Sequence, residues 1–129
     1  MSRPANLRYL KSHEWCKLEG NIATIGITDF AVSHLSDLVF LDLPEVKTDT
    51  MRGEPFGEIE SVKAVSDLYA PMTGEIIERN ERLQAELDLL GKDPFGEGWM
   101  LKIRVEKPAE WESLLDDAAY QQVIDAESH

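Results

Sequence analysis

The chain has 129 residues, of which 43% are hydrophobic and 29% are charged, a composition typical of a single globular domain. Its formal net charge is −12, and because such a surface repels phosphate groups we expect no binding to nucleic acid. The single cysteine excludes an internal disulfide, and no apolar run is long enough to cross a membrane, so we expect no membrane partner.

The first third of the chain predicts a hairpin followed by a short helix. Its opening segment, MSRPAN, is similar neither to a signal peptide nor to a transit peptide, which favours a cytoplasmic protein, or a mitochondrial matrix protein if a leader was removed. A turn signal at 19–21 precedes the β-branched residues 22–27, which should pair back on the preceding segment. Thr28 can accept a backbone N–H and begin a helix over 29–35, which ends at Ser36.

The rest of the chain predicts further short strands and helices. Residues 38–43 should form a strand that ends at Pro44, because proline cannot donate a hydrogen bond to a neighbouring strand. Trp99 to Val105 alternates apolar and polar residues, the pattern of a half-buried strand. The other expected elements are a polar loop at 47–52, strands within 53–61 and 67–80, a helix at 81–90 ended by Gly91, a loop at 92–98, helical spacing from Trp111 to Ala118, a second helix capped by Asp116, and a frayed tail at 125–129. Many short strands with peripheral helices favour a mainly β sandwich.

One lysine, Lys63, separates two of these strand-like segments in GEIESVKAVSDLYAPMTG, residues 57–74. Gly-Glu pairs at 53–54 and 74–75 each lie about ten residues from it, as expected for two strands in a quasi-twofold arrangement with the lysine at their turn. The turn lacks the Asn-Gly or Asp-Gly of a common hairpin, which indicates that something other than turn chemistry selects its residues. A solvated lysine is the commonest explanation for such a position, but Glu60 and the small flanking residues make this segment resemble the swinging-arm lysine of lipoyl domains.

Residues in the rest of the chain extend this similarity to the glycine cleavage system H protein family. The match runs from about Leu7 to Tyr120 in one register, which is far more specific than the lysine motif alone. The matching residues are Tyr9, Ser12-His13-Glu14-Trp15, Gly20, Ala23-Thr24, Gly26-Ile27-Thr28-Asp29, Leu35, Asp37-Leu38-Val39-Phe40, Leu43-Pro44, Glu60-Ser61-Val62-Lys63-Ala64, Ser66-Asp67, Ala70-Pro71, Gly74-Glu75, Asp93-Pro94 and Gly96-Glu97-Gly98-Trp99. The chain departs from the family pattern at Ser36, Leu87 and Gly91, where Gly, Pro and Asn are usual, but not at the lysine hairpin.

This resemblance implies a particular fold and a carrier function. The implied fold is a lipoyl/biotinyl-type β-sandwich, or barrel-sandwich hybrid, with peripheral and C-terminal helices. Residues 1–129 would form a single lipoyl-carrier domain, with its lipoyl-like core at about 20–105 and a C-terminal helical segment at about 108–126. The resemblance also implies a non-catalytic carrier with lipoate covalently bound to Lys63 through an amide, which shuttles the aminomethyl group of glycine.

The implied partners are enzymes. A pyridoxal-phosphate glycine decarboxylase (P protein) would load the lipoyl arm, a tetrahydrofolate-dependent aminomethyltransferase (T protein) would unload it, and the flavin enzyme dihydrolipoamide dehydrogenase (L protein) would re-form its disulfide. A lipoate ligase or a lipoyl/octanoyltransferase would attach the arm. The tether would raise the effective concentration of the lipoyl sulfur at each docked site.

Four residues beside Lys63 are candidates for ligase recognition or for shaping the hairpin, namely Glu60, Ser61, Val62 and Ala64. Glu60 admits two interpretations, a solvated surface charge or a recognition element for the ligase. The sequence is equally compatible with both.

The cluster Ser12-His13-Glu14-Trp15 also admits two interpretations. It is either a strand edge with Trp15 in the core or part of a cleft in which the loaded arm shelters from water. The aminium group of the cargo would need a negative partner in such a cleft. Glu14 and Asp67 are the candidates, with Ser12 as a hydrogen-bonding neighbour and His13 beside them.

The sequence contains no recognisable catalytic or metal-binding motif. His13, His34 and His129 lack metal-ligand spacing, and there is no His-Glu-x-x-His motif, Gly-rich phosphate loop or nucleophile elbow. Cys16 lies in a strand-like segment and is expected to be a packed thiol, and His34 is expected to be a surface or partly packed residue.

Other functions are compatible with parts of the sequence. An H-like protein that donates or relays lipoyl groups to other lipoyl-dependent enzymes would need the same lysine. A biotinyl carrier is disfavoured, because its lysine lies between two methionines whereas Val62 and Ala64 flank Lys63. A small enzyme using His13 and Glu14 would turn over a substrate without modification, and an acidic interaction domain would have no arm.

Overall fold

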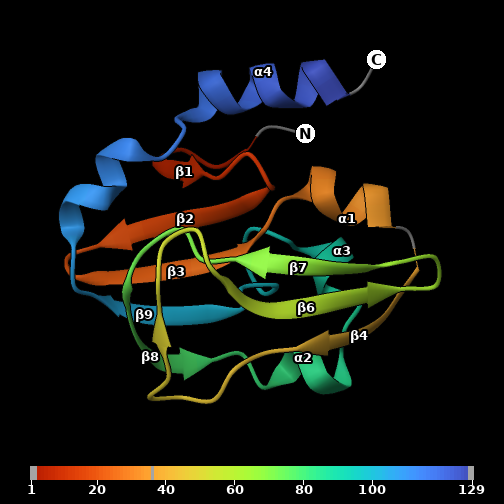
Figure 1. Ribbon diagram of the computed structural model, residues 1–129. Helices are drawn as coiled ribbons and strands as arrows, with labels where there is room; N and C mark the ends of the chain where they lie inside the picture. Colours follow the sequence, from red (N-terminus) through yellow and green to blue (C-terminus); the bar gives the residue numbers. More distant parts are fainter. Residues whose placement is uncertain (1–2, 36, 128–129) are drawn as a thin grey trace.

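The computed structural model describes residues 3–35 and 37–127, which fold into two antiparallel sheets (Figure 1). The larger sheet has the strand order β1-β2-β3-β9-β8-β5 and the smaller sheet has the order β4-β6-β7. The strands are β1 (Leu7–Tyr9), β2 (Glu14–Glu19), β3 (Ile22–Ile27), β4 (Leu38–Asp42), β5 (Asp49–Thr50), β6 (Pro55–Ser61), β7 (Val65–Tyr69), β8 (Gly74–Arg79) and β9 (Leu101–Val105). The helices are α1 (Asp29–Leu35), α2 (Arg82–Ala85), α3 (Leu89–Lys92), the 3₁₀ helix η1 (Pro108–Ser113) and α4 (Asp117–Glu127). The predicted mainly β class with peripheral and C-terminal helices is confirmed.

Apolar side chains from both sheets meet in one core. Ile103 on β9 belongs to the larger sheet, and Ile59 on β6 and Leu68 on β7 belong to the smaller sheet, yet all three side chains are at most 2% exposed. β9 alternates buried and less buried residues as its sequence predicted, although the strand begins at Leu101 rather than at Trp99. The alternation of the strands therefore determines which side chains enter the core and which stay outside it.

A second apolar cluster attaches the C-terminal helix to the edge of the larger sheet. Tyr120 on α4 stacks on Tyr9 of β1, with ring centroids 4.3 Å apart and ring planes 6° apart. The Arg3 guanidinium donates to Asp117 at 2.7 Å and lies over the Tyr120 ring. The Tyr9 N–H donates to the Leu115 carbonyl at 2.9 Å. As a result, α4 lies across the β1 edge, and its last turn is on the same side of the molecule as α1 (Figure 1).

The two predicted helix caps are confirmed. The Ala31 N–H donates to Thr28 Oγ1 at 3.3 Å at the start of α1, and the Ala119 N–H donates to Asp116 Oδ1 at 2.9 Å at the start of α4. Ser36, where the first helix was expected to end, lies outside the described residues.

Two predictions for the middle of the chain are wrong. Residues 47–52 are not only a loop, because β5 pairs with β8 and the Thr50 hydroxyl donates to the Met72 carbonyl at 2.9 Å. The helix expected at 81–90 is instead two short helices, α2 and α3, and Gly91 lies inside α3 without a positive φ. Helices this short are unstable by themselves, so tertiary packing rather than local spacing determines where they begin and end.

The C-terminal segment also differs from its prediction. The residues from Trp111 to Ala118 do not form one helix. They span the end of the 3₁₀ helix, a non-helical segment in which Leu115 pairs with Tyr9, and the start of α4. Residues 125–127 are helical rather than frayed, and Glu127 contacts His13 across the fold. The remaining tail residues, with His129, lie outside the described residues.

Candidate functional site

Lys63 lies at the tip of the β6–β7 hairpin, at one end of the smaller sheet (Figure 1). The two strands pair antiparallel up to Glu60 and Val65, and residues 62–64 connect them. The Lys63 side chain is exposed, and no carboxylate of the described residues forms an ion pair with its ammonium group. The hairpin thus presents the amine of Lys63 to solvent.

The buried hydroxyl of Ser61 organises this tip. It accepts the N–H of Lys63 at 3.3 Å and the N–H of Ala64 at 3.2 Å, while the Ser61 N–H donates to the Ala64 carbonyl at 2.8 Å. The Val62 N–H donates to the Asp37 carbonyl at 2.9 Å and connects the tip to the segment before β4. A side-chain hydroxyl therefore supplies the turn geometry that an Asn-Gly pair supplies in common hairpins, so local turn chemistry does select this serine.

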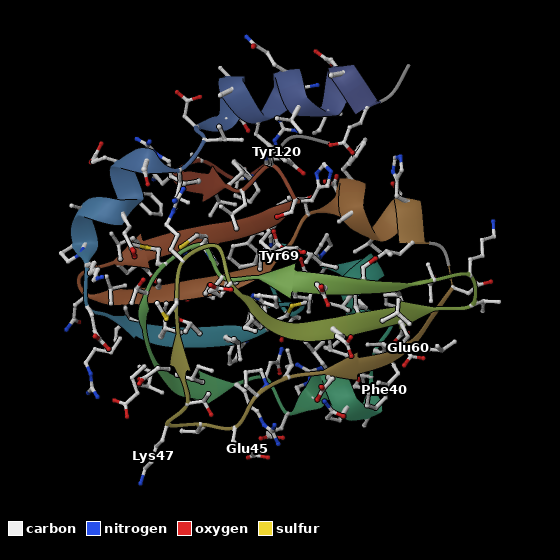
Figure 2. All side chains as sticks on the ribbon, in the orientation of Figure 1. Phe40, Glu45, Lys47, Glu60, Tyr69 and Tyr120 are labelled. Atoms are coloured by element: carbon white, nitrogen blue, oxygen red, sulfur yellow. The ribbon has the colours of Figure 1, made fainter. Side chains whose placement is uncertain are left out.

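Exposed apolar side chains surround the tip. Val62 is 70% exposed, Val65 56% and Phe40 50%. Phe40, Glu60 and Val65 are in register across β4, β6 and β7, and Figure 2 shows Glu60 and Phe40 near each other on the smaller sheet. Apolar side chains left exposed around the hairpin tip indicate a surface that other proteins contact. Glu60, Val62 and Ala64 do not line the cleft between β7 and α1.

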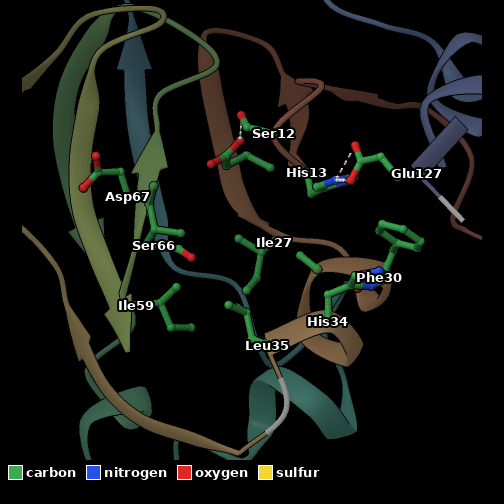
Figure 3. A pocket seen from close by; sticks show the side chains of 13 residues that line it. Ser12, His13, Ile27, Phe30, His34, Leu35, Ile59, Ser66, Asp67 and Glu127 are labelled. Carbon is green, nitrogen blue, oxygen red and sulfur yellow. Dashed lines mark hydrogen bonds and ion pairs between the residues drawn. The ribbon is translucent and has the colours of Figure 1, made fainter. Parts of the chain in front are cut away.

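A cleft of about 190 Å³ opens between β7 and α1 (Figure 3). Its lining comes from the loop before β2, the first residue of β2, the end of β3, α1, β6, β7 and the last residue of α4. The lining residues are Ser12, His13, Glu14, Ile27, Phe30, Ala31, His34, Leu35, Ile59, Ser66, Asp67, Leu68 and Glu127. The cleft is lined by both apolar and polar side chains, which is typical of a small-molecule site.

Ser66 and Asp67 project to opposite faces of β7, because successive side chains of a strand alternate. In Figure 3 the Asp67 side chain points away from Ser12, whereas Ser66 points toward Ile27. Asp67 is exposed and Glu14 is buried. Glu14 is therefore the carboxylate that lies inside the cleft, and Asp67 lies at its margin.

Glu14 is a carboxylate buried between the two sheets, with 1% of its surface exposed. It accepts the Ser12 hydroxyl at 2.5 Å and the Tyr69 N–H of β7 at 2.8 Å. Burial raises the pKa of Glu14 to about 7, against the opposing effect of these hydrogen bonds. Such a carboxylate can balance a cation when ionised and can take up a proton close to neutral pH.

His13 connects the cleft to the C-terminal helix. Its Nδ1 lies 2.7 Å from the Tyr120 hydroxyl, and its Nε2 lies 3.0 Å from Glu127. The imidazole also packs against Phe30 of α1, with ring centroids 4.9 Å apart. Phe30 in turn packs against His34, which is exposed as expected.

The four residues proposed from the sequence for a cleft, Ser12, His13, Glu14 and Asp67, all line this one, and the structure adds residues that sequence reasoning missed. Tyr120 and Glu127 were missed because they are more than a hundred positions from His13, and no local spacing connects them. Ser66 could have been found, because the alternation of β7 places it on the face opposite Asp67.

The described residues give no sign of a metal site or a reactive thiol. In residues 3–35 and 37–127 no three His, Cys, Asp or Glu side chains are placed to hold a metal ion. Cys16 is buried as expected, and burial raises the pKa of its thiol to about 12. None of the helices in these residues has both the length and the apolar character needed to span a membrane.

The chain is similar to known proteins of one family over most of its length. The family model described as "Glycine cleavage H-protein" matches residues 7–127. The glycine cleavage system H protein of Symbiobacterium thermophilum is 51% identical over 117 residues, which cover 91% of each chain. That of Nostoc punctiforme is 52% identical over 124 residues, which cover 96% of each chain. A crystal structure of a glycine cleavage system H protein from Mycobacterium marinum superposes with a TM-score of 0.85 at 36% identity, over 93% of this chain and 97% of that one.

The raised pKa of Glu14 predicts a pH dependence of stability. Because the folded pKa of about 7 exceeds the ordinary value of 4.5, ionising Glu14 costs more in the folded protein than in the unfolded chain. The free energy of unfolding should therefore fall, through this group, as the pH rises from about 4.5 to about 7, by up to about 3 kcal/mol. Denaturant unfolding of the wild type and of Glu14→Gln should show the wild type losing stability relative to the variant over this range.

Side-chain carboxyl NMR gives a direct check of this assignment. The Glu14 resonance should titrate with a midpoint near 7. A midpoint at the ordinary value of 4.5 would show that burial causes no net rise of this pKa and would remove the predicted pH dependence.

Proposed function

The chain belongs to the glycine cleavage H-protein family, the lipoyl carriers of the glycine cleavage system, and we propose that Lys63 is the residue of this chain that carries lipoate. The observation that carries the proposal is the exposed lysine at the tip of a hairpin whose second strand, β7, leads into the cleft. As a carrier subunit the chain works with the other components of the system. We place no catalytic residue in it.

The partners in this proposal are the three enzymes of the cycle. Glycine decarboxylase loads the aminomethyl group, the tetrahydrofolate-dependent aminomethyltransferase removes it, and dihydrolipoamide dehydrogenase restores the disulfide. A lipoate ligase or a lipoyl/octanoyltransferase forms the amide at Lys63. The cytoplasm is the proposed location, supported by the bacterial source of relatives such as those from Symbiobacterium thermophilum and Nostoc punctiforme.

The lipoyl group fits the distance between Lys63 and the cleft. Lysine with lipoate attached reaches about 14 Å at ordinary bond lengths. Ser66 and Leu68, which line the cleft, are three and five residues beyond Lys63 along the chain, at most about 10 and 17 Å at about 3.3 Å per residue. An arm that folds back along β7 therefore ends in the cleft.

Within the cleft, Glu14 is the proposed partner of the cargo. The aminomethyl group carries a positive charge at neutral pH, and a cation taken out of water needs a negative partner. Ionised Glu14, held by Ser12 and by the Tyr69 N–H, supplies that charge in a fixed position. Asp67 adds negative charge at the margin, and the surrounding apolar residues exclude the water that would hydrolyse the cargo.

The residues at the tip have a separate proposed role in modification. Ser61 fixes the backbone of Lys63 and Ala64, so that the attaching enzyme meets one conformation of the tip. Val62 is adjacent to Lys63 at the tip, and Glu60 lies on β6 at the last strand pair before it, where they would supply an apolar contact and a charge for recognition. A preorganised tip lowers the entropy lost when an enzyme binds it.

Enzymatic lipoylation tests the attachment site. The protein and its Lys63→Arg variant are incubated with lipoate, ATP and a lipoate ligase and examined by intact mass and peptide mapping. The expected result is one lipoyl group, confined to Lys63, in the wild type and none in the variant. Modification of another lysine, or none on the folded wild type, would contradict the proposal.

Ser61→Ala tests the role of the tip. Without the Ser61 hydroxyl, the N–H groups of Lys63 and Ala64 lose their acceptor, so the free energy of unfolding should fall by about 1 kcal/mol. Lipoylation should slow several-fold but should still occur at Lys63. Ser113→Ala is the matched control, because its exposed hydroxyl donates to the Glu110 carbonyl on the 3₁₀ helix, away from the hairpin. Equal lipoylation rates for the wild type and Ser61→Ala would contradict this role.

A further inference from the structure

The last turn of α4 is part of the cleft, although the rest of the lining comes from the first 68 residues. Glu127 lines the cleft together with Ser12, His13 and Phe30 (Figure 3). It lies at the C-terminal end of α4, and its contact with His13 spans 114 positions in the chain. The C-terminal helix therefore forms part of the wall around the site proposed for the cargo.

A chain of hydrogen bonds connects this wall to α1. The Tyr120 hydroxyl lies 2.7 Å from both His13 Nδ1 and Thr28 Oγ1, and both Glu127 oxygens lie within 3.1 Å of His13 Nε2. A carboxylate can only accept, so for a neutral imidazole Nε2 carries the proton and donates to Glu127. Nδ1 then accepts from the Tyr120 hydroxyl, which accepts from the Thr28 hydroxyl. Each group in this chain has a partner of the right kind.

The backbone at His13 is held in an unusual conformation. Its φ is +82°, in the left-handed region that non-glycine residues rarely adopt and that costs about 1–3 kcal/mol. Two backbone hydrogen bonds fix it, from the His13 N–H to the Leu10 carbonyl and from the Thr28 N–H to the His13 carbonyl, both at 3.0 Å. The conformation leaves the side chain only 13% exposed, between α1 and α4.

The start of α4 has anchors besides the Tyr120–His13 contact. Tyr120 stacks on Tyr9, Asp117 binds Arg3, and the Tyr9 N–H donates to the Leu115 carbonyl. These contacts fix the first turns of the helix on the β1 edge. The Glu127–His13 contact acts at the other end of the helix, where Glu127 lines the cleft.

We propose that His13 is a positioning residue that holds the last turn of α4 against the cleft, so that the C-terminal helix excludes water from the loaded arm. The inference rests on the proposed function, in which the arm enters this cleft. His13 acts through Glu127 and does not touch the cargo, whereas Glu14 does. The C-terminal helix would then determine how long the cargo survives between enzymes.

Substitutions at Glu127 separate position from charge. Glu127→Ala removes the acceptor, whereas Glu127→Gln removes the charge but keeps an oxygen that can accept the His13 Nε2 proton. Asp125→Ala is the matched control, because this carboxylate lies on the same turn and accepts from Gln121 instead. His13→Asn adds a second test, since asparagine tolerates a positive φ but is too short to contact both Tyr120 and Glu127.

Two measurements are made on each variant. Amide hydrogen exchange of the unmodified protein reports how firmly the last turn of α4 is held, and release of ammonia from the loaded protein reports shelter of the cargo. Glu127→Ala and His13→Asn should speed exchange at residues 123–127 and increase ammonia release about fivefold, the effect of one lost net hydrogen bond. Glu127→Gln and Asp125→Ala should stay within about twofold of the wild type.

The outcomes that would overturn the inference are distinct. If Glu127→Gln releases ammonia as fast as Glu127→Ala, the charge matters and the positioning role is wrong. If Glu14→Gln accelerates release but Glu127→Ala does not, the cleft shelters the arm without α4. If neither substitution changes the rate, the shelter itself fails, and the inference fails with that part of the proposed function.

Discussion

The structure around the cleft depends on one buried carboxylate. Glu14, on the first position of β2 in the larger sheet, accepts the backbone N–H of Tyr69 on the edge strand of the smaller sheet. An unpaired N–H at a buried strand edge is costly, and here a side chain rather than another strand satisfies it. This hydrogen bond joins the two sheets at the free edge of β7, where β7 pairs with no strand of the described residues. The cleft lies beside this edge, with Glu14 inside it.

The proposed function needs a fixed cleft and a mobile arm, and the β6–β7 hairpin suits both. Strand pairing and the Ser61 hydroxyl hold the backbone of the tip, while the Lys63 side chain extends into solvent. β7, the second strand of the hairpin, lines the cleft through Ser66 and Leu68. The distance along β7 from the tip to these residues determines how far the proposed arm must fold back. A raised pKa of about 7 at Glu14 means that proton uptake near neutral pH competes with binding of a cation there.

The sequence predicted those features that depend on local chemistry. The alternation of β9, the Thr28 and Asp116 caps, and a strand–lysine–strand hairpin all follow from residues within a few positions of one another. Features that depend on tertiary contacts could not be predicted in this way. β5 exists because it pairs with β8, and the contact of Glu127 with His13 joins segments 114 positions apart. The hypothesis of a sheltering cleft named Ser12, His13, Glu14 and Asp67, but only the structure shows that Glu14 is buried and Asp67 is exposed.

The most direct test of the central claim is an amide NMR comparison of the lipoylated protein before and after loading with glycine and glycine decarboxylase. If the loaded arm lies along β7 with its cargo against Glu14, the largest shift changes should occur at Ser12, Glu14 and Tyr69, whose N–H shares the Glu14 carboxylate. Changes confined to residues 62–64 at the tip would show that the arm stays in solvent. That result would contradict a sheltering role for the cleft.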